Sequence, residues 1–443
     1  MTSRGSSRMV NRCARGGGIG GLTLAVALSQ LQLDHLIEID IYEAAPELTQ
    51  VGAGITFWPR TWDILEKLGL DIALAEHLAP GQHVPDGTPR LAFQFRKGDQ
   101  REGVPILDLV IAGAALSFHR ASVQEILLKQ LSPAIRTHLS SRFVSYEISP
   151  GKEIGLHFEN GTKATCDLLV GADGLRSTVR KQFVAENTPE GHVLSTDPVW
   201  SGTFAYRGMM SSQFIKERMP NHRVLSHPTI YCGKNKHVVA YPILQGKIVN
   251  VVAYVSDLRM EGSVYEGPSF KDVSREEAIS LYDNWEAEVR ILAQGMEKPS
   301  RWAIQAINIL PRYAADNIFL LGDAAHAMTP HQGNGAGQAI EDAYILAKLI
   351  QKALHRDNLS LHRLDQVYDG IRRPAANNVH AASRAHGLLY ELNAPGYEWI
   401  KEGDEDLPEE MLMKLGKMIT DDWEYAWTTT IDKDLQEAME AMS

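Results

Sequence analysis

The sequence predicts an α/β fold in which a discontinuous domain carries an inserted β-rich segment and is followed by a helical region. A glycine-rich turn at 16–21 leads into an apolar helix, the start of a strand–turn–helix unit. Between about 198 and 256, β-branched and aromatic runs alternate with the turn signals GKNK and LQGK, as in an antiparallel sheet. From 356 onward the pattern is helical and charged.

The glycine-rich turn has the spacing GxGxxG, with Gly16, Gly18 and Gly21 before the helix LTLAVALSQL. The first glycine permits a tight turn, the second lets the backbone approach a pyrophosphate, and the third allows close helix–strand packing. The helix N-terminus that follows favours a phosphate. Glu43 ends the strand-like segment 37–42 and is suited to accept hydrogen bonds from ribose hydroxyls. The unit therefore predicts a Rossmann-like dinucleotide-binding domain.

The strand expected before Gly16 is unusually polar, because its sequence is MVNRCAR. Asn11, Arg12 and Arg15 in a central parallel strand cost several kcal/mol unless they are paired. Two interpretations stay open: a short, frayed strand, or an N-terminus other than the native one. The first 15 residues are basic and lack an apolar core, which excludes a secretory signal and leaves a disordered tail or a short organelle-targeting stretch.

Two further segments have the form of a buried strand that runs into a glycine-containing loop. DLLVGA at 167–172 leads into GADGLRSTVR, which contains Asp173. IFLL at 318–321 leads into GDAAHAMTPHQGNGAGQ, which contains Asp323 and is followed by a helix. Asp323 would also suit a helix N-cap, and His326 in the same loop is interpreted as a structural histidine.

The β-rich segment supplies polar side chains for a ligand pocket. Arg207 lies in TFAYRGMM and can clamp a carboxylate or stabilise a phenolate. His237 and Tyr241 lie in HVVAYP, four residues apart on one strand, and therefore share a face. The alternatives are that Tyr206 and Tyr241 are ordinary aromatic residues of the sheet and that Arg207 forms a structural ion pair.

These patterns divide the chain into four segments. Residues 1–190 form the N-terminal part of the nucleotide-binding domain, and residues 301–355 return to it. Residues 191–300 form a β-rich domain that binds the substrate. Residues 356–443 form the helical C-terminal region.

Composition narrows the possible partners. The 443 residues carry a net charge of −11, which argues against nucleic acid. The 3 cysteines are widely spaced, so we expect neither a disulfide framework nor a metal site, and an intracellular, cytoplasmic location fits best. No apolar run approaches the roughly 20 residues of a transmembrane helix.

The three glycine-containing segments, in this order, resemble the single-component flavoprotein aromatic hydroxylases of the para-hydroxybenzoate hydroxylase fold group. Within that group the sequence is most similar to fungal salicylate hydroxylase-like monooxygenases, from about residue 16 to 430. The resemblance implies FAD as cofactor, NADH or NADPH as a transient reductant, and O2 and a small phenolic acid as substrates. It implies that oxygen is transferred through a flavin C4a-hydroperoxide. We expect a monomer or a homodimer.

The resemblance also assigns roles to individual residues. The FAD contacts are Gly16, Gly18, Gly21, Glu43, Ala53, Gly54, Arg120, Asp173, Asp323, Pro330, Gly335 and Ala336. Arg207 and Tyr241 are the catalytic residues, and His237, His331 and Gln332 bind the substrate. A helix N-terminus beside the flavin would stabilise the negative charge of its reduced form. Arg60 departs from the small polar residue that relatives often have in its loop.

The sequence leaves several functions open. The first is hydroxylation of a salicylate-like acid, with or without loss of the carboxylate. Dearomatising hydroxylation of a resorcinol-type polyketide suits the same residues. A plain nicotinamide dehydrogenase would leave the segment around Asp323 unexplained. A non-catalytic homologue is supported only by the polar first strand.

Overall fold

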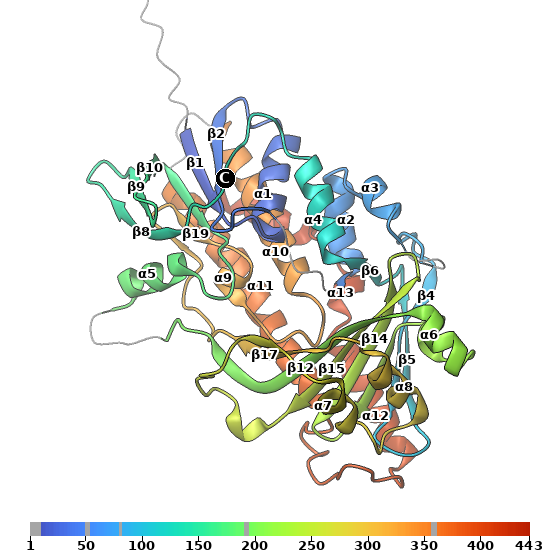
Figure 1. Ribbon diagram of the computed structural model, residues 1–443. Coiled ribbons are helices and arrows are strands. Elements are labelled where there is room, and N and C mark those ends of the chain that lie inside the picture. Colours follow the sequence, from blue (N-terminus) through green and yellow to red (C-terminus); the bar gives the residue numbers. More distant parts are fainter. Residues whose placement is uncertain (1–9, 49–53, 79–81, 190–194, 356–360) are drawn as a thin grey trace, which may run out of the picture.

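The computed structural model describes residues 10–48, 54–78, 82–189, 195–355 and 361–443 (Figure 1), and the statements below concern these residues. The side chains of residues 10–15, 361 and 362 are not among those described. Two large sheets, two small ones and a set of helices make up the described part of the chain, so the predicted α/β class is confirmed.

A six-stranded, mostly parallel sheet forms the centre of the N-terminal half. Its strand order is β18 (Ala314–Ala315), β19 (Ile318–Leu320), β11 (Leu168–Gly171), β1 (Val10–Arg15), β2 (Ile37–Tyr42) and β7 (Arg136–His138). The polar sequence before the first glycine forms β1, which pairs with β2 from Val10 to Arg15 and with β11 on its other side. The strands of three segments far apart in sequence thus meet in one sheet.

Helices and a small sheet cover this central sheet (Figure 1). The apolar helix α1 (Ile19–Gln30) packs against α10 (Gly335–Leu354), and both belong to one large hydrophobic core. The other helices of this half are α2 (Pro59–Lys67), α3 (Asp71–Ala75), α4 (Arg120–Lys129), α5 (Thr178–Asn187) and α9 (Asp323–His326). The small sheet contains β8 (Phe143–Ile148), β9 (Ile154–Phe158) and β10 (Lys163–Cys166).

An eight-stranded sheet forms the second half of the molecule. Its order is β16 (Phe270–Asp272), β17 (Ser300–Ala306), β12 (Val199–Ser211), β15 (Ile248–Ser256), β14 (Lys236–Ile243), β13 (Thr229–Gly233), β4 (Pro89–Lys97) and β5 (Val104–Ala112). Its outer layer contains α6 (Ser212–Arg218), α7 (Arg275–Ser280), α8 (Ala287–Gly295) and the 3-10 turn Arg223–Leu225. A second 3-10 turn, Leu258–Met260, contacts β12.

The large sheet takes in strands from outside the range 191–300. β4 and β5 lie within 1–190, the range assigned to the nucleotide-binding domain, yet β4 pairs in parallel with β13. Most of β17 lies beyond residue 300 and pairs with β12. Pairing between strands so distant in sequence leaves no local pattern, so the sequence boundaries did not include them. A short ladder of β3 (Gly54–Phe57) and β6 (Leu116–His119) joins the two halves.

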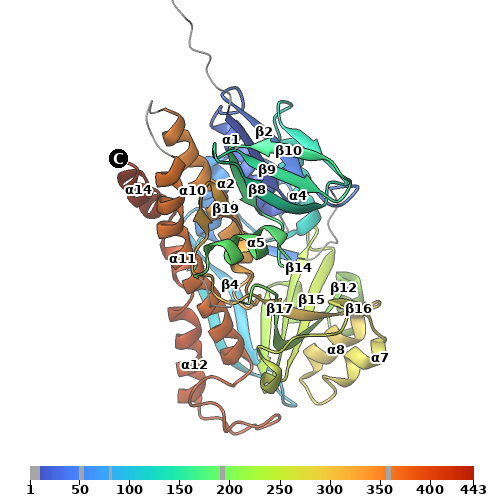
Figure 2. The same ribbon diagram turned by 90° about the vertical axis from the view of Figure 1, so that its left-hand side faces the viewer.

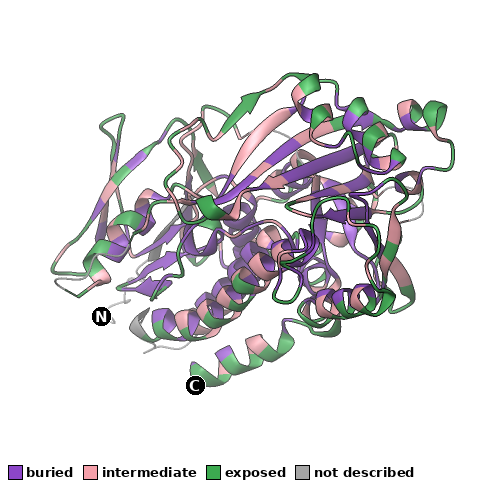
Figure 3. Cartoon of the chain, turned by 90° about the horizontal axis from the view of Figure 1, so that it is seen from below, coloured by how far each residue is buried: buried purple, intermediate pink, exposed green. Residues whose placement is uncertain are grey.

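The C-terminal helices run along one side of both halves (Figure 2). They are α11 (Leu361–Tyr390), α12 (Glu409–Asp421), α13 (Tyr425–Thr428) and α14 (Asp432–Ala441). α11 contacts α10, and α12 packs against β5. Figure 3 shows buried residues along the strands and on the inward faces of the helices, with α14 largely exposed. Among the described helices, none combines the length and apolar character that crossing a membrane requires.

Candidate active site

Two adjoining cavities lie between the halves of the molecule. The first has a volume of about 230 Å³ and is enclosed largely by the eight-stranded sheet and by the loop that precedes α10. The second has a volume of about 200 Å³ and lies over the N-termini of α1 and α10. Arg120, Asp323, Gly335 and Ala336 line both cavities, so the two spaces are neighbours.

The glycine-rich turn has the close approaches that its spacing predicts. Gly16 has φ +116°, and a Cβ atom there would lie 2.2 Å from the carbonyl oxygen of Ala172. A Cβ atom on Gly21 would lie 2.2 Å from the carbonyl oxygen of Gly16. Gly18 caps α1 and lines the second cavity. Only glycine fits at positions 16 and 21, and these close approaches hold the N-terminus of α1 against the end of β1.

Glu43 follows β2 and lies under this turn. Its carboxylate accepts hydrogen bonds from the backbone N–H of Gly17 at 2.8 Å and of Ala45 at 2.9 Å. The carboxylate therefore holds the glycine-rich turn, and its two oxygens have lone pairs left for a ribose hydroxyl.

The loop after β19 places a second helix N-terminus at the cavities. Asp323 follows Gly322, which has φ +61°, and its exposed side chain faces the shared space. Pro330 lines the first cavity. The 20-residue helix α10 begins at Gly335, where a Cβ atom would meet nothing within 4 Å. The N-terminus of such a helix favours negative charge in the space before it.

A buried network of charges anchors this loop from behind. Arg372 of α11 donates to Asp342 at 2.8 Å and to Glu341 at 3.0 Å, and all three side chains are buried. Asp342 also accepts from the backbone N–H of Gly322 at 2.9 Å and lies 2.6 Å from Nε2 of His326. Burial raises the pKa of Asp342, but His326 and Arg372 outweigh it and lower the value to about 2. His326 is thus part of the scaffold behind the loop.

Arg60 belongs to the same scaffold. Its buried guanidinium donates to Glu341 at 3.1 Å and to the hydroxyl of Thr429 at 2.8 Å, and it pairs with Asp434 of α14. It lies outside the lining of the two cavities. The arginine at this position, where relatives often have a small polar residue, therefore ties α2 to α10 and to the C-terminal helices.

The residues around the second cavity fit a dinucleotide. Arg120 begins α4, its Nε is buried and has no hydrogen-bond partner, and burial lowers its pKa while Asp323 opposes that shift. Buried polar atoms are normally hydrogen-bonded, so a cation of this kind indicates an anionic ligand. The glycines of the first turn, Asp323 and the N-terminus of α10 complete a site that would hold FAD.

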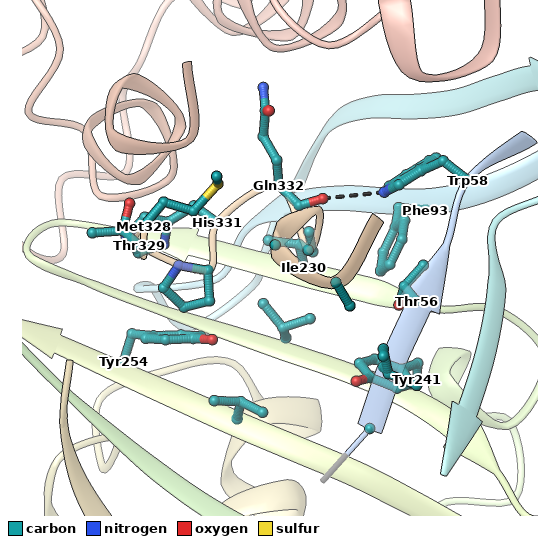
Figure 4. Close-up of a pocket in the computed structure, with 18 of the residues that line it drawn as sticks. Thr56, Trp58, Phe93, Ile230, Tyr241, Tyr254, Met328, Thr329, His331 and Gln332 are labelled. Carbon is teal, nitrogen blue, oxygen red and sulfur yellow. Dashed lines mark hydrogen bonds between the residues drawn. The ribbon is translucent and has the colours of Figure 1, made fainter. Parts of the chain in front are cut away.

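Two tyrosines from neighbouring strands lie on the same wall of the first cavity (Figure 4). Tyr241 of β14 was predicted from the sequence, and Tyr254 comes from the neighbouring strand β15. Val239 and Val252 line the cavity from the same two strands, at the alternate positions that share a face. Burial raises the pKa of Tyr254 to about 12, and burial raises that of Tyr241 still further. Both hydroxyls therefore keep their protons at neutral pH.

Gly54 of β3 makes room for Tyr241. A Cβ atom on Gly54 would lie 2.1 Å from the tyrosine hydroxyl, so the phenol ring rests against the backbone of this strand. Gly54 itself lines the first cavity. Ala53, the residue before it, lies outside the described residues.

Arg207 of β12 supplies positive charge to the same cavity. Its Nε is buried without a hydrogen-bond partner, and its guanidinium carbon lies 5.0 Å from the centre of the Trp302 ring. The neighbouring Arg301 pairs with Glu277 at 3.3 Å, whereas Arg207 forms no ion pair with any described residue. A structural ion pair therefore does not account for Arg207.

His331 and Gln332 contribute to the lining of the first cavity in different ways. His331 lines the first cavity, and burial lowers its pKa well below the usual value, which leaves the imidazole neutral. Gln332 contributes backbone, since its carbonyl accepts from Nε1 of Trp58 at 3.1 Å and its side chain points away from the tyrosines (Figure 4). Its Nε2 instead donates to the carbonyl of Asp422 at 3.1 Å.

Two residues assigned from the sequence are not among those that line the cavities. His237 is fully buried outside the cavity lining, stacked on Tyr254 with ring centres 4.3 Å apart and bonded to Glu391 at 3.0 Å. It shares a face with Tyr241, as the alternation requires, but the ring of Tyr254 lies against it. Asp173 accepts from the backbone N–H of Thr178 at 2.7 Å and so caps α5, apart from the lining of both cavities.

The sequence reasoning missed most of the aromatic wall. Trp58, Phe93, Tyr254 and Trp423 line the first cavity, and they come from four separate segments. Only Tyr254 could have been found from the sequence. It alternates with Val252 along a strand that follows the strand of Tyr241 and pairs with it, so the same alternation predicts that its side chain faces the ligand.

Comparisons with known proteins identify the family. A family model described as an FAD binding domain matches residues 13–383. The chain belongs to this family. It is 35% identical over 434 residues to a salicylate hydroxylase of Pseudomonas putida, covering 96% of this chain and 92% of that protein. It is 32% identical to the 6-methylsalicylate 1-monooxygenase of Aspergillus terreus, with 87% of this chain and 84% of that protein covered.

A solved structure agrees with these relatives. The substrate complex of a salicylate hydroxylase superposes with a TM-score of 0.81 and 27% identity, over 98% of both chains. The FAD complex of HpxO from Klebsiella pneumoniae, with a TM-score of 0.69 and 20% identity, shares the fold. The protein is thus an FAD-dependent aromatic monooxygenase, as predicted. Its reductant is NADH or NADPH, as is typical of the family. A plain nicotinamide dehydrogenase is excluded.

Replacing Asp323 by asparagine is expected to weaken FAD binding by about 10–100-fold, because a hydrogen bond to a charged group contributes about 1.5–3 kcal/mol. Asp323 is exposed at the junction of the two cavities, so the stability of the apoprotein should not change. Titration of the apoprotein with FAD, followed by the quenching of flavin fluorescence, measures the effect. Wild-type affinity in D323N would contradict the role assigned to this carboxylate.

Proposed function

We propose that the enzyme hydroxylates a phenolic acid of the salicylate type, an aromatic ring that carries a carboxylate beside its hydroxyl. The observation that supports this most strongly is the cation of Arg207 in a cavity that is otherwise largely aromatic and apolar. A half-buried guanidinium whose Nε is buried without a hydrogen-bond partner favours an anionic ligand, and the aromatic wall favours a planar ring. The relatives named for salicylate and 6-methylsalicylate support the same class of substrate.

The chain's own residues would bind and orient this substrate. The guanidinium of Arg207 would receive the carboxylate in a charge-assisted pair. The hydroxyl of Tyr241, kept protonated by burial, would donate to the phenolic oxygen and stabilise its negative charge. The apolar residues Val239, Val252 and Ile230 would exclude water from the ring.

The cofactor would be held by the glycine-rich turn, Arg120, Asp323 and the start of α10. When bound, FAD accepts a hydride from NADH or NADPH and activates O2 for transfer of one oxygen atom to the ring. The N-terminus of α10 would stabilise negative charge at the edge of the cofactor that lies before it. His331, neutral in its buried position, adds a polar group without a second positive charge.

A substrate series tests the proposal. Salicylate, 6-methylsalicylate, benzoate, phenol and a resorcinol-type polyketide are supplied to the flavin-loaded enzyme, and NADH and NADPH oxidation is measured together with the product. We expect hydroxylated product from the two salicylates, with loss of the carboxylate where hydroxylation occurs at the carbon that bears it. Product from the polyketide alone would replace this proposal with dearomatising hydroxylation, and no product from any compound would support a non-catalytic homologue.

Replacing Tyr241 by phenylalanine is expected to lower kcat/KM for salicylate about tenfold while bound FAD is retained, because one hydrogen bond contributes about 0.5–1.5 kcal/mol. Tyr206 offers a matched control. It lies on the opposite face of the same sheet, and its hydroxyl donates to Glu277 at 3.0 Å. Steady-state kinetics should show normal turnover for Y206F. Equal effects of Y206F and Y241F would remove the special role of Tyr241.

A further inference from the structure

A row of side chains crosses the eight-stranded sheet beside the first cavity. In the strand register, Phe270 lies opposite Trp302, Trp302 opposite Ala205, and Ala205 opposite Tyr254. Residues directly opposite one another project from the same face of a sheet. The row therefore runs from the edge strand β16 to Tyr254, a residue of the cavity wall.

Ala205 is the smallest residue of this row. Its small side chain stands between the two rings of Trp302 and Tyr254, and all three belong to one hydrophobic cluster. Arg207 lies two residues further along β12 and so projects from the same face. Its guanidinium carbon lies 5.0 Å from the centre of the Trp302 ring, within the range of a cation–π contact.

The Trp302 ring is itself held in place. It stacks on Phe270 with ring centres 5.0 Å apart and an angle of 22° between the planes. Its Nε1 donates to the hydroxyl of Ser300 at 2.9 Å. The indole therefore presents a fixed face to the guanidinium.

Arg207 has few other contacts that would fix its orientation. Its Nε is buried without a partner, and within the described part of the chain it forms no ion pair. A long arginine side chain loses up to about 2 kcal/mol of conformational freedom when it is ordered. A stacking surface that orders it before the ligand arrives reduces the entropy that binding must otherwise supply.

We propose that Trp302 is a positioning residue that holds the Arg207 guanidinium in the orientation in which it receives the substrate's carboxylate. Trp302 lies outside the cavity lining and acts through Arg207. The inference rests on the proposed function, since it requires that Arg207 bind the carboxylate.

Substitutions along the row test the proposal in the flavin-loaded enzyme. W302L removes the ring, W302M is a second variant without a ring should W302L not fold, and W302F keeps an aromatic face. We expect W302L or W302M to raise KM for salicylate about tenfold with kcat changed less than about threefold, and W302F to stay within about threefold of wild type. F270L removes only the ring that stacks on Trp302 and leaves the indole beside Arg207, so it should raise KM less than W302L does.

A double-mutant cycle with R207A separates positioning from a general structural role. In the R207A background, W302L should have no further effect on KM, because the residue through which it acts is absent. Binding of phenol, which lacks the carboxylate, should be the same in wild type and W302L. Additive effects of the two substitutions, or a normal KM in W302L while R207A is impaired, would overturn the role of Trp302 alone. A normal KM in R207A would overturn the proposed function of Arg207 itself.

Discussion

Replacing Arg372 by leucine is expected to lower the free energy of unfolding by about 3–5 kcal/mol, because it removes the guanidinium that two buried carboxylates share. Arg372 is fully buried and donates to Asp342 at 2.8 Å and to Glu341 at 3.0 Å. Asp342 in turn accepts from the backbone of Gly322, so the loss extends to the turn that carries Asp323. Denaturant unfolding followed by circular dichroism, with FAD affinity measured in parallel, should report both effects.

The next residue along α11 provides the control. Arg373 pairs with Asp369 at 3.0 Å, four residues away on the helix surface, and its side chain is 34% exposed. Exposed pairs of this kind contribute about 0.2–1 kcal/mol. R373L should therefore unfold close to the wild-type denaturant midpoint. Equal losses in R372L and R373L would show that the buried network does not support the loop as described.

Replacing Arg207 by alanine is expected to lower kcat/KM for salicylate by about 10²–10³-fold, since loss of one partner of a buried charge pair costs about 2–5 kcal/mol. Bound FAD should remain, because Arg207 lines only the first cavity. The effect on phenol, which has no carboxylate, should be less than about fivefold. Steady-state kinetics with both compounds and the flavin absorbance of each variant measure these quantities.

Arg301 is the matched control for Arg207. It lies on β17, the strand that pairs with β12, opposite the residue before Arg207. Its side chain projects from the other face of the sheet, where it lies over Phe204 and pairs with Glu277. R301A should retain kcat/KM for salicylate within about threefold. If R207A lost FAD, or if salicylate and phenol were affected equally, Arg207 would not be the carboxylate-binding residue.

Local sequence patterns predicted the parts of the fold and site that depend on neighbours in sequence. The spacing of Gly16, Gly18 and Gly21 predicted a turn into α1, and the structure has that turn with φ +116° at Gly16. Alternation along β14 placed Tyr241 on a ligand-facing side. The loop around Asp323 combined a strand end, a run of glycines and a helix start, a pattern with little purpose other than to approach a ligand.

Features that depend on distant pairing left no such pattern. β4 and β5 join the large sheet through β13, more than a hundred residues later in sequence, and their own composition does not specify that partner. His237 has the right face but lies behind Tyr254, because the register of β14 and β15 places the two rings directly opposite each other. Arg372 occurs in a charged helical stretch that resembles a solvated surface, and only the packing of α11 on α10 buries it.

The most direct test of the central claim is single-turnover product analysis of the flavin-loaded enzyme with salicylate and isotopically labelled oxygen gas. We expect NADH or NADPH to be consumed in proportion to hydroxylated product and each product molecule to carry one labelled oxygen atom. Reductant consumed with only hydrogen peroxide formed, and salicylate recovered intact, would contradict the assignment of a salicylate-type acid as substrate.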